Sequence, residues 1–160
     1  MPANYQDNSW FAIANFSQYL YVKDNGVAPK DRLRRGEVVS GVGLFGRFGF
    51  APEDTNTITR YASAGVFAHG LFDTRPYDSF GVGVYYNAIS SDLKDSIKTL
   101  TGGAADVINE KGMEIFYDFA ITPAMRLISS YQHIWNPFAA QVADQQKSTD
   151  VFTARLTVSW

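Results

Sequence analysis

The sequence has no cysteine among its 160 residues. Disulfide bonds, thiolate metal sites and cysteine nucleophiles are therefore excluded. No stretch approaches the ~18 consecutive apolar residues of a membrane-spanning helix, and the polar opening MPANYQDNSW has no apolar segment typical of a secretory signal. The net charge is −2, so the composition gives no reason to expect nucleic acid as a partner.

Motifs for catalysis and for metal or phosphate binding are also missing. The chain contains no G-x-S-x-G, no H-E-x-x-H and no P-loop, and His69 and His133 lack the spacing of a metal site. Glu114 and Asp118 resemble a catalytic carboxylate pair only in sequence. Four residues along a strand separate them by ~13 Å, which exceeds the ~5–9.5 Å of glycosidase carboxylates. We predict no enzyme activity, no metal and no cofactor.

One glycine-rich stretch, GVGLFGRFGF, carries the Gly41-x-Gly43-x-x-Gly46 spacing of a dinucleotide-binding loop. Such a loop is followed by a helix, whereas this stretch runs into the turn-forming segment APEDTNT and then into another strand-like run. Its residues also alternate between two faces, with Leu44 on one side and Arg47 on the other. Glycines inside a strand mark bends or the close approach of a neighbouring backbone, so we predict a strand.

Seven runs of the chain alternate between apolar and polar residues with the period of a β-strand. Each run far exceeds the ~5–6 residues of an ordinary strand in a soluble protein and is long enough for the ~9–11 residues of a tilted transmembrane strand. The runs are Ser9–Val22, Val39–Phe50, Ile58–Phe72, Asp78–Ile89, Lys111–Thr122, Ala124–Trp135 and Thr149–Trp160.

The two faces of these runs differ in character. Charged residues sit in mid-strand opposite a continuous apolar stripe, as Glu114 and Asp118 do opposite Ile115 and Tyr117. In a soluble sandwich this pattern gives a core and a wet surface, whereas in a porin it gives a lipid-facing outside and a wet lumen. Aromatic residues at the strand ends favour the porin, because they suit the two membrane interfaces: Tyr19, Tyr21, Phe48, Phe80, Trp135 and Trp160.

The connections alternate between short and long, as they do in outer-membrane barrels. Thr122–Ala124 and Asp73–Asp78 are tight, whereas 90–110 and 136–148 are predicted to be long extracellular loops. The connection 23–36 is an exception, because it is long where a short turn is expected. In the first long loop, SSDLKDSIKTLTGG predicts a short helix that is capped by Ser91 or Asp92 and ended by Gly102. We interpret this loop as packing on itself in preference to folding over a pore mouth.

Several stretches together resemble the carbohydrate-selective porin (OprB) family of Gram-negative outer membranes: GLFGRFGF, YASAGVFAHGLF, RPYDSFGVGVYYNAISSDL and EIFYDFAITPAMRL. The most specific part is Arg75-Pro76-x-Asp78-x-Phe80. The resemblance implies an all-β fold, an antiparallel transmembrane β-barrel of sixteen strands through which glucose and similar sugars diffuse passively. The 160 residues, as a single unit of seven or eight strands, then correspond to the C-terminal part of that barrel.

The resemblance also implies partners. Sugars are the permeants, and outer-membrane lipid and lipopolysaccharide surround the barrel. The last strand resembles the segment that the outer-membrane assembly machinery reads, with alternate apolar residues up to a terminal aromatic: Phe152, Leu156, Val158 and Trp160. The missing strands come from the rest of a longer protein, from an eighth strand near Met1–Asn8, or from further copies of the chain.

Alternation assigns polar side chains to the lumen. A site selective for sugars needs planar donors, carboxylate acceptors and an aromatic face, and Arg47 with Phe45 beside it is the strongest candidate. The other candidates either contact sugar or pair with one another to keep the lumen wet: Glu114, Asp118, Arg126, Arg155, Tyr85 and Asn87. Arg75 is expected to fix its turn with Asp78. The facing of the first strand is ambiguous.

Two further hypotheses compete with the channel. A small closed barrel of eight strands with a structural or adhesive role fits the strand count, since ~8 strands leave room only for side chains. Glycines on the predicted lumen side, such as Gly65 and Gly83, argue against such a packed interior. A soluble β-sandwich enzyme requires a catalytic constellation that the sequence lacks.

Overall fold

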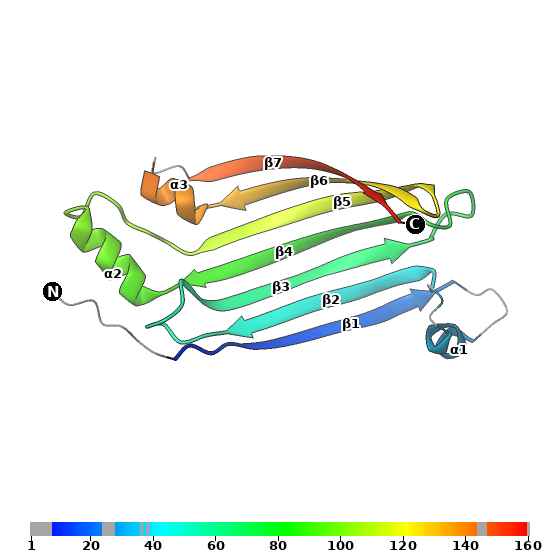
Figure 1. Ribbon diagram of the computed structural model, residues 1–160, viewed down its shortest axis with the longest axis horizontal. Coiled ribbons are helices and arrows are strands. Elements are labelled where there is room, and N and C mark those ends of the chain that lie inside the picture. Colours follow the sequence, from blue (N-terminus) through cyan, green and yellow to red (C-terminus); the bar gives the residue numbers. More distant parts are fainter. Residues whose placement is uncertain (1–7, 24–27, 36, 38, 144–146, 160) are drawn as a thin grey trace.

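The computed structural model describes residues 8–23, 28–35, 37, 39–143 and 147–159. Seven strands form one antiparallel sheet in which each strand pairs with the next along the chain (Figure 1). The predicted all-β fold and the seven alternating runs are confirmed, although the first strand is shorter than expected. The strands are β1 (Ala12–Val22), β2 (Gly41–Phe50), β3 (Ile58–His69), β4 (Ser79–Ile89), β5 (Glu110–Thr122), β6 (Met125–Trp135) and β7 (Ser148–Val158).

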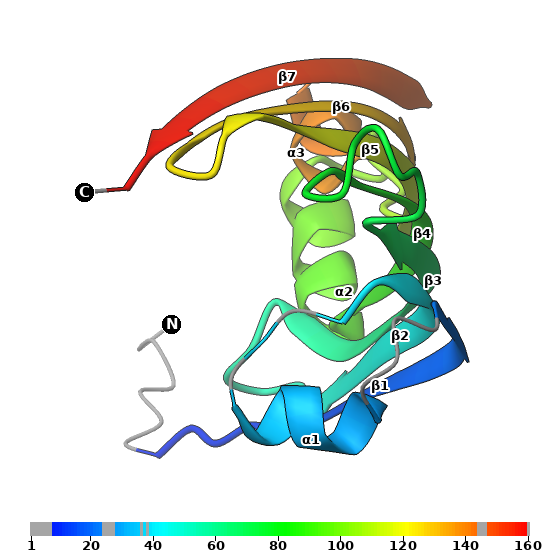
Figure 2. The same cartoon turned by 90° about the vertical axis from the view of Figure 1, so that its right-hand side faces the viewer.

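The sheet is a single layer that curves into an arc from β1 to β7 when viewed along the strands (Figure 2). Within the described residues, the buried apolar side chains lie near strand ends or in connections and form no central core: Val39, Ala51, Ala68, Ile89, Ala105, Val107 and Ala120. Alternation along the strands therefore creates two open faces, one convex and one concave. The expected eighth strand near Met1–Asn8 falls almost wholly outside the described residues.

The connections gather at two ends of the sheet (Figure 1). The "α2 end" carries the β2–β3, β4–β5 and β6–β7 connections, with α2 (Ser91–Leu100) and α3 (Phe138–Ala143). The "α1 end" carries the other three connections. Helix α1 (Pro29–Arg34) lies within the β1–β2 connection, which is long although the alternation of short and long connections predicts a short turn there. Of the described helices, none is long and apolar enough to cross a membrane.

Helix α2 matches the helix predicted in the first long loop, with a different cap. Ser90 is the N-cap, and not Ser91 or Asp92, because its Oγ accepts a hydrogen bond from the backbone N of Leu93 at 3.3 Å. Gly102 follows the helix with a φ of 60°, a conformation that glycine adopts without strain. Ala105 of this loop is buried, and Ile108 exchanges hydrogen bonds with the Gln141 side chain of α3 at 2.8 and 3.0 Å. The helix also lies on the concave side of the arc (Figure 2).

The tight β3–β4 turn is held by a cluster that we call the Asp78 clasp: Arg75, Asp78, Tyr117, Phe119 and Ala120. The Asp78 carboxylate, 3% exposed, accepts hydrogen bonds from Arg75 Nε at 2.9 Å, Arg75 Nη2 at 3.0 Å, Tyr117 OH at 2.6 Å and Ala120 N at 3.0 Å. Arg75 also donates to Ala120 O at 3.0 Å and lies 3.8 Å above the Phe119 ring. The predicted Arg75–Asp78 pairing is confirmed, and the clasp joins this turn to the end of β5.

The clasp predicts a specific dependence of stability on pH. Burial alone raises the pKa of Asp78, but the hydrogen bonds from Arg75, Tyr117 and Ala120 outweigh it and lower the pKa to about 2. Because the folded pKa lies below the unfolded one, the Asp78 contribution is complete above about pH 4 and is lost as the pH falls towards 2. We expect the difference in unfolding free energy between the wild type and Asp78→Asn, measured in urea, to shrink between pH 5 and pH 2. A difference that stays constant over this range would contradict the assignment.

Candidate functional site

Glu110, the first residue of β5, identifies the concave face of the sheet. Its carboxylate accepts a hydrogen bond at 2.9 Å from the backbone N of Phe138, at the start of α3, and α3 lies on the concave side (Figure 2). Side chains alternate along a strand, and the cross-strand register extends the assignment from β5 to the other six strands. The concave face thus carries all the predicted lumen candidates: Phe45, Arg47, Tyr85, Asn87, Glu114, Asp118, Arg126 and Arg155.

Four residues that stand opposite one another on neighbouring strands form a row across the middle of this face, which we call the transverse row. It begins with an aromatic residue and ends with an acidic one. The register places Phe45 opposite Gly65, Gly65 opposite Gly83, and Gly83 opposite Glu114. The Phe45 ring fills the space above both glycines, since its Cζ atom lies 2.5 Å from where a Cβ on Gly65 would stand and 3.2 Å from the equivalent point on Gly83. The ring therefore extends from β2 across β3 and reaches β4, beside the strand that carries Glu114.

Aromatic rings cover glycines in the neighbouring rows as well. In each case a ring occupies the space next to a glycine on the adjacent strand: Tyr85 at Gly112, Phe67 at Gly43 and Phe116 at Gly81. The glycines predicted to line the inside, such as Gly65 and Gly83, do lie on the concave face, but rings cover most of them. The covered glycines and their rings give the concave face flat apolar areas between its polar groups.

Towards the α2 end, the polar candidates pair with one another. Tyr85 OH and Asn87 Nδ2 donate to Glu110 Oε1 at 3.1 and 3.0 Å. Arg47 Nε donates to Asn15 Oδ1 at 2.6 Å, and this contact places Asn15 of β1 on the concave face. Sequence analysis did not single out Glu110, because the predicted strand began at the next residue. Its even spacing from Glu114 could have identified it, since residues an even number of positions apart share one face of a strand.

Towards the α1 end, Arg126 and Asp118 form an ion pair in which two nitrogens of the guanidinium donate hydrogen bonds to the carboxylate. Arg126 Nε lies 3.0 Å from Asp118 Oδ1, and Arg126 Nη2 lies 2.8 Å from Asp118 Oδ2 and 3.0 Å from Tyr77 O. In contrast, the side chains of Glu114 and Arg155 make no hydrogen bond or ion pair with any described residue. Asp118 and Arg126 therefore satisfy each other, whereas Glu114 and Arg155 keep their polar atoms available.

The convex face carries most of the predicted interface aromatics and the apolar side of the last strand. Large apolar side chains remain exposed along it, with Phe152 77% and Val84 57% exposed. An uncovered apolar face of this extent is typical of a surface that meets lipid or another protein. The predicted residues that lie on it are Tyr21, Phe48, Phe80, Trp135, Phe152, Leu156 and Val158.

Tyr19 differs from the prediction, because it lies on the concave face. A β-bulge between Tyr19 and Tyr21 sends the two side chains to opposite faces. Tyr19 OH donates to Val39 O at 2.9 Å, and its ring meets the Phe67 ring edge-on at 5.3 Å between centroids. Tyr19 is therefore removed from the set of interface aromatics, while Trp160 lies outside the described residues.

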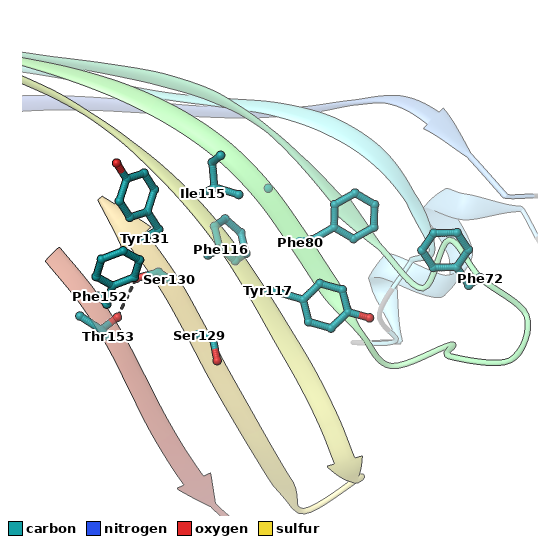
Figure 3. Close-up of a pocket in the computed structure, with 11 residues that line it drawn as sticks. Phe72, Phe80, Ile115, Phe116, Tyr117, Ser129, Ser130, Tyr131, Phe152 and Thr153 are labelled. Carbon is teal, nitrogen blue, oxygen red and sulfur yellow. Dashed lines mark hydrogen bonds between the residues drawn. The ribbon is translucent and has the colours of Figure 1, made fainter. Parts of the chain in front are cut away.

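A groove runs over the convex face between β4 and β7 (Figure 3). Phe72, Phe80 and Tyr117 form a stack of rings along one part of it, with centroid separations of 6.0 and 6.2 Å. Tyr131 and Phe152 form another part, with centroids 4.9 Å apart. The groove exists because a small residue, Ser129, stands between these two groups of rings. Its walls are almost wholly apolar, as a lipid-facing surface requires.

Comparison with known proteins agrees with this geometry. A profile of the family described as "Carbohydrate-selective porin, OprB family" matches residues 1–159. Porin B of Pseudomonas aeruginosa is 25% identical over 120 residues, which cover 68% of this chain and 26% of the relative. A solved structure of Pseudomonas putida OprB at high pH aligns with a TM-score of 0.71 and 22% identity, over 95% of this chain and 35% of that one.

The structural likeness supports a partial β-barrel, since the sheet matches part of a porin barrel. The chain spans about a quarter of the length of the curated relative that it matches, 26%. The family match, in contrast, extends over nearly all of the chain. The chain belongs to the carbohydrate-selective porin, OprB family.

Proposed function

We propose that this chain forms part of the wall of an outer-membrane channel through which small sugars diffuse passively. The observation that carries the proposal is the single-layer sheet with an uncovered apolar convex face and a polar concave face. A bilayer covers the convex face, and the concave face lines the aqueous path. The family match supports sugars as the permeants. No catalytic step is part of this function.

The same arrangement supports a proposed orientation and proposed partners. Among the described strands, β1 and β7 each pair with one neighbour, so each has one edge without a partner strand in the described residues, and a bilayer does not tolerate such an edge. We propose that further strands complete the barrel, either from a longer protein or from copies of this chain. The α2 end, with loops 90–110 and 136–148, faces the cell exterior. Lipid and lipopolysaccharide contact the convex face, and the assembly machinery reads β7.

The small closed barrel of eight strands is the weaker alternative. Its interior requires interlocking side chains. The glycines Gly65 and Gly83 do not count against it, because the Phe45 ring fills the space above them. The side chains of Glu114 and Arg155, however, lack the partners that a packed polar interior would supply among the described residues. The alignment with about a third of a larger porin chain, 35%, likewise supports a wall segment.

The test is conductance in planar bilayers, with and without glucose. Two preparations are used: the refolded 160-residue chain, and a hybrid in which this chain replaces the matching segment of Porin B. The proposal predicts stable steps that glucose reduces in at least one of them. Pores that conduct without any response to glucose, or a folded chain that never conducts in either preparation, would overturn it.

A further inference from the structure

We propose that the Phe45 ring, with Glu114 in the same transverse row, forms a subsite for hexopyranose rings whose hydroxyls are mostly equatorial. We call it the Phe45 subsite, and it rests on the proposed channel function. It consists of an apolar surface with a carboxylate acceptor at the next position of the row. Such sugars present C–H groups on their ring faces and hydroxyls around their edge, so they match this combination.

The first argument is the position of the ring. Phe45 projects from β2 and covers the two glycines that follow it in the transverse row, with Cζ 2.5 Å and 3.2 Å from the Cβ positions that Gly65 and Gly83 lack. A ring tip this close to both positions extends from β2 across β3 towards β4, where neither glycine has a side chain. The ring therefore places an apolar surface on the concave side of the sheet.

The second argument is the acidic residue that follows the ring in the row. Glu114 stands opposite Gly83 on the next strand and on the same face, so it is the next position after the two glycines that the ring covers. Its carboxylate has no hydrogen-bond partner among the described residues. Arg47 lies on the same face of β2, but its Nε donates to Asn15 on β1, on the other side of β2 from the ring, so it stands outside the subsite. A carboxylate is a strong acceptor for sugar hydroxyls.

The third argument is a contrast with the other polar groups of the face. Asp118 and Arg126 are bound to each other, and Tyr85 and Asn87 are bound to Glu110. Among the acidic side chains of the concave face, Glu114 alone has no such partner in the described part of the chain. The unsatisfied carboxylate and the aromatic platform occur together in one transverse row, and this juxtaposition defines the subsite.

The test measures the block of conductance by glucose and by sorbitol in whichever preparation responds to sugar. Sorbitol carries similar hydroxyls but has no ring face. Phe45→Ala should weaken the glucose block about tenfold, because stacking and ring burial are lost, and should remove the preference for glucose over sorbitol. Glu114→Gln should weaken the block by both sugars about threefold or more, because a charged acceptor is lost.

Phe16→Ala is the matched control. The Phe16 ring also covers a glycine, Gly46, but on the convex face, so this variant should leave the block by both sugars unchanged. A Phe45→Ala channel that keeps the wild-type preference for glucose would overturn the subsite while leaving the channel function intact. A wild-type channel with no response to sugar would overturn the channel function itself, and with it the subsite.

Discussion

Replacing Asp78 by alanine is expected to lower the free energy of unfolding by about 3 kcal/mol. The substitution removes the acceptor of four hydrogen bonds, three of them from side chains and one from the backbone N of Ala120. A buried N–H without an acceptor costs about 1–3 kcal/mol, and breaking a buried ion pair costs about 3–5 kcal/mol. Arg75 is 36% exposed, so water compensates part of the second cost and the lower end applies.

Asp73→Ala is the matched control for this prediction. Asp73 lies in the same β3–β4 turn and pairs with Lys23 Nζ at 2.5 Å, but its side chain is 91% exposed. An exposed ion pair contributes under about 1 kcal/mol. Urea unfolding of chains inserted in lipid vesicles measures both variants, and Asp78→Asn supplies an intermediate value if the alanine variant does not fold. Equal losses at positions 73 and 78 would contradict the clasp.

The clasp also shows what sequence reasoning reaches and where it stops. The spacing of Arg75 and Asp78 in a tight turn predicted their pairing, because both residues lie in one local segment. The contacts to Tyr117 and Ala120 join positions about 40 residues apart. These contacts depend on the register of β4 against β5, and local patterns do not specify that register.

For most strands, the sequence predicted which side chains lie on the polar face of the sheet, because charged residues alternate with a continuous apolar stripe. β1 was ambiguous because polar residues occur on both of its sides, Asn15 on the concave one and Gln18 on the convex one. The bulge between Tyr19 and Tyr21 also reverses the alternation beyond Tyr19. The partner strand decides the matter, since Asn15 stands opposite Arg47.

The candidate site was predictable as a list of residues but not as an arrangement. Alternation placed Phe45, Arg47 and Glu114 on one face. It did not show that the Phe45 ring lies over glycines of two other strands, or that Glu114 stands at the end of the same row. Both facts arise from the pairing of four strands in register, a non-local property of the chain.

Arginine substitutions at two adjacent serines should show most directly which face of the sheet meets lipid and which meets water. Ser129 and Ser130 lie side by side in the middle of β6. The register places Ser129 on the convex face opposite Tyr117, and Ser130 on the concave face opposite Phe116. The two positions share residue type, strand and depth, so the side of the sheet is the main variable between them.

Ser129→Arg is expected to destabilise the membrane-inserted chain by about 2–4 kcal/mol, the cost of a lipid-facing arginine near the bilayer midplane. The groove in which Ser129 stands has apolar walls (Figure 3), so it offers the guanidinium no counter-ion. Ser130→Arg should cost only about 1 kcal/mol, since it loses the 2.6 Å hydrogen bond to Thr153 but places its charge in water. It should also change the conductance of the pore.

Urea unfolding in lipid vesicles measures the free energy of unfolding of each variant. The same measurement on protein in detergent micelles provides the reference value for each. If both faces of the sheet met water, arginine would cost about the same at either serine, because an exposed charge stays hydrated. Equal costs in lipid would therefore contradict a membrane-facing convex surface. A larger cost at Ser130 would reverse the assignment of the faces, and with it the location of Phe45, Arg47 and Glu114 along the sugar path.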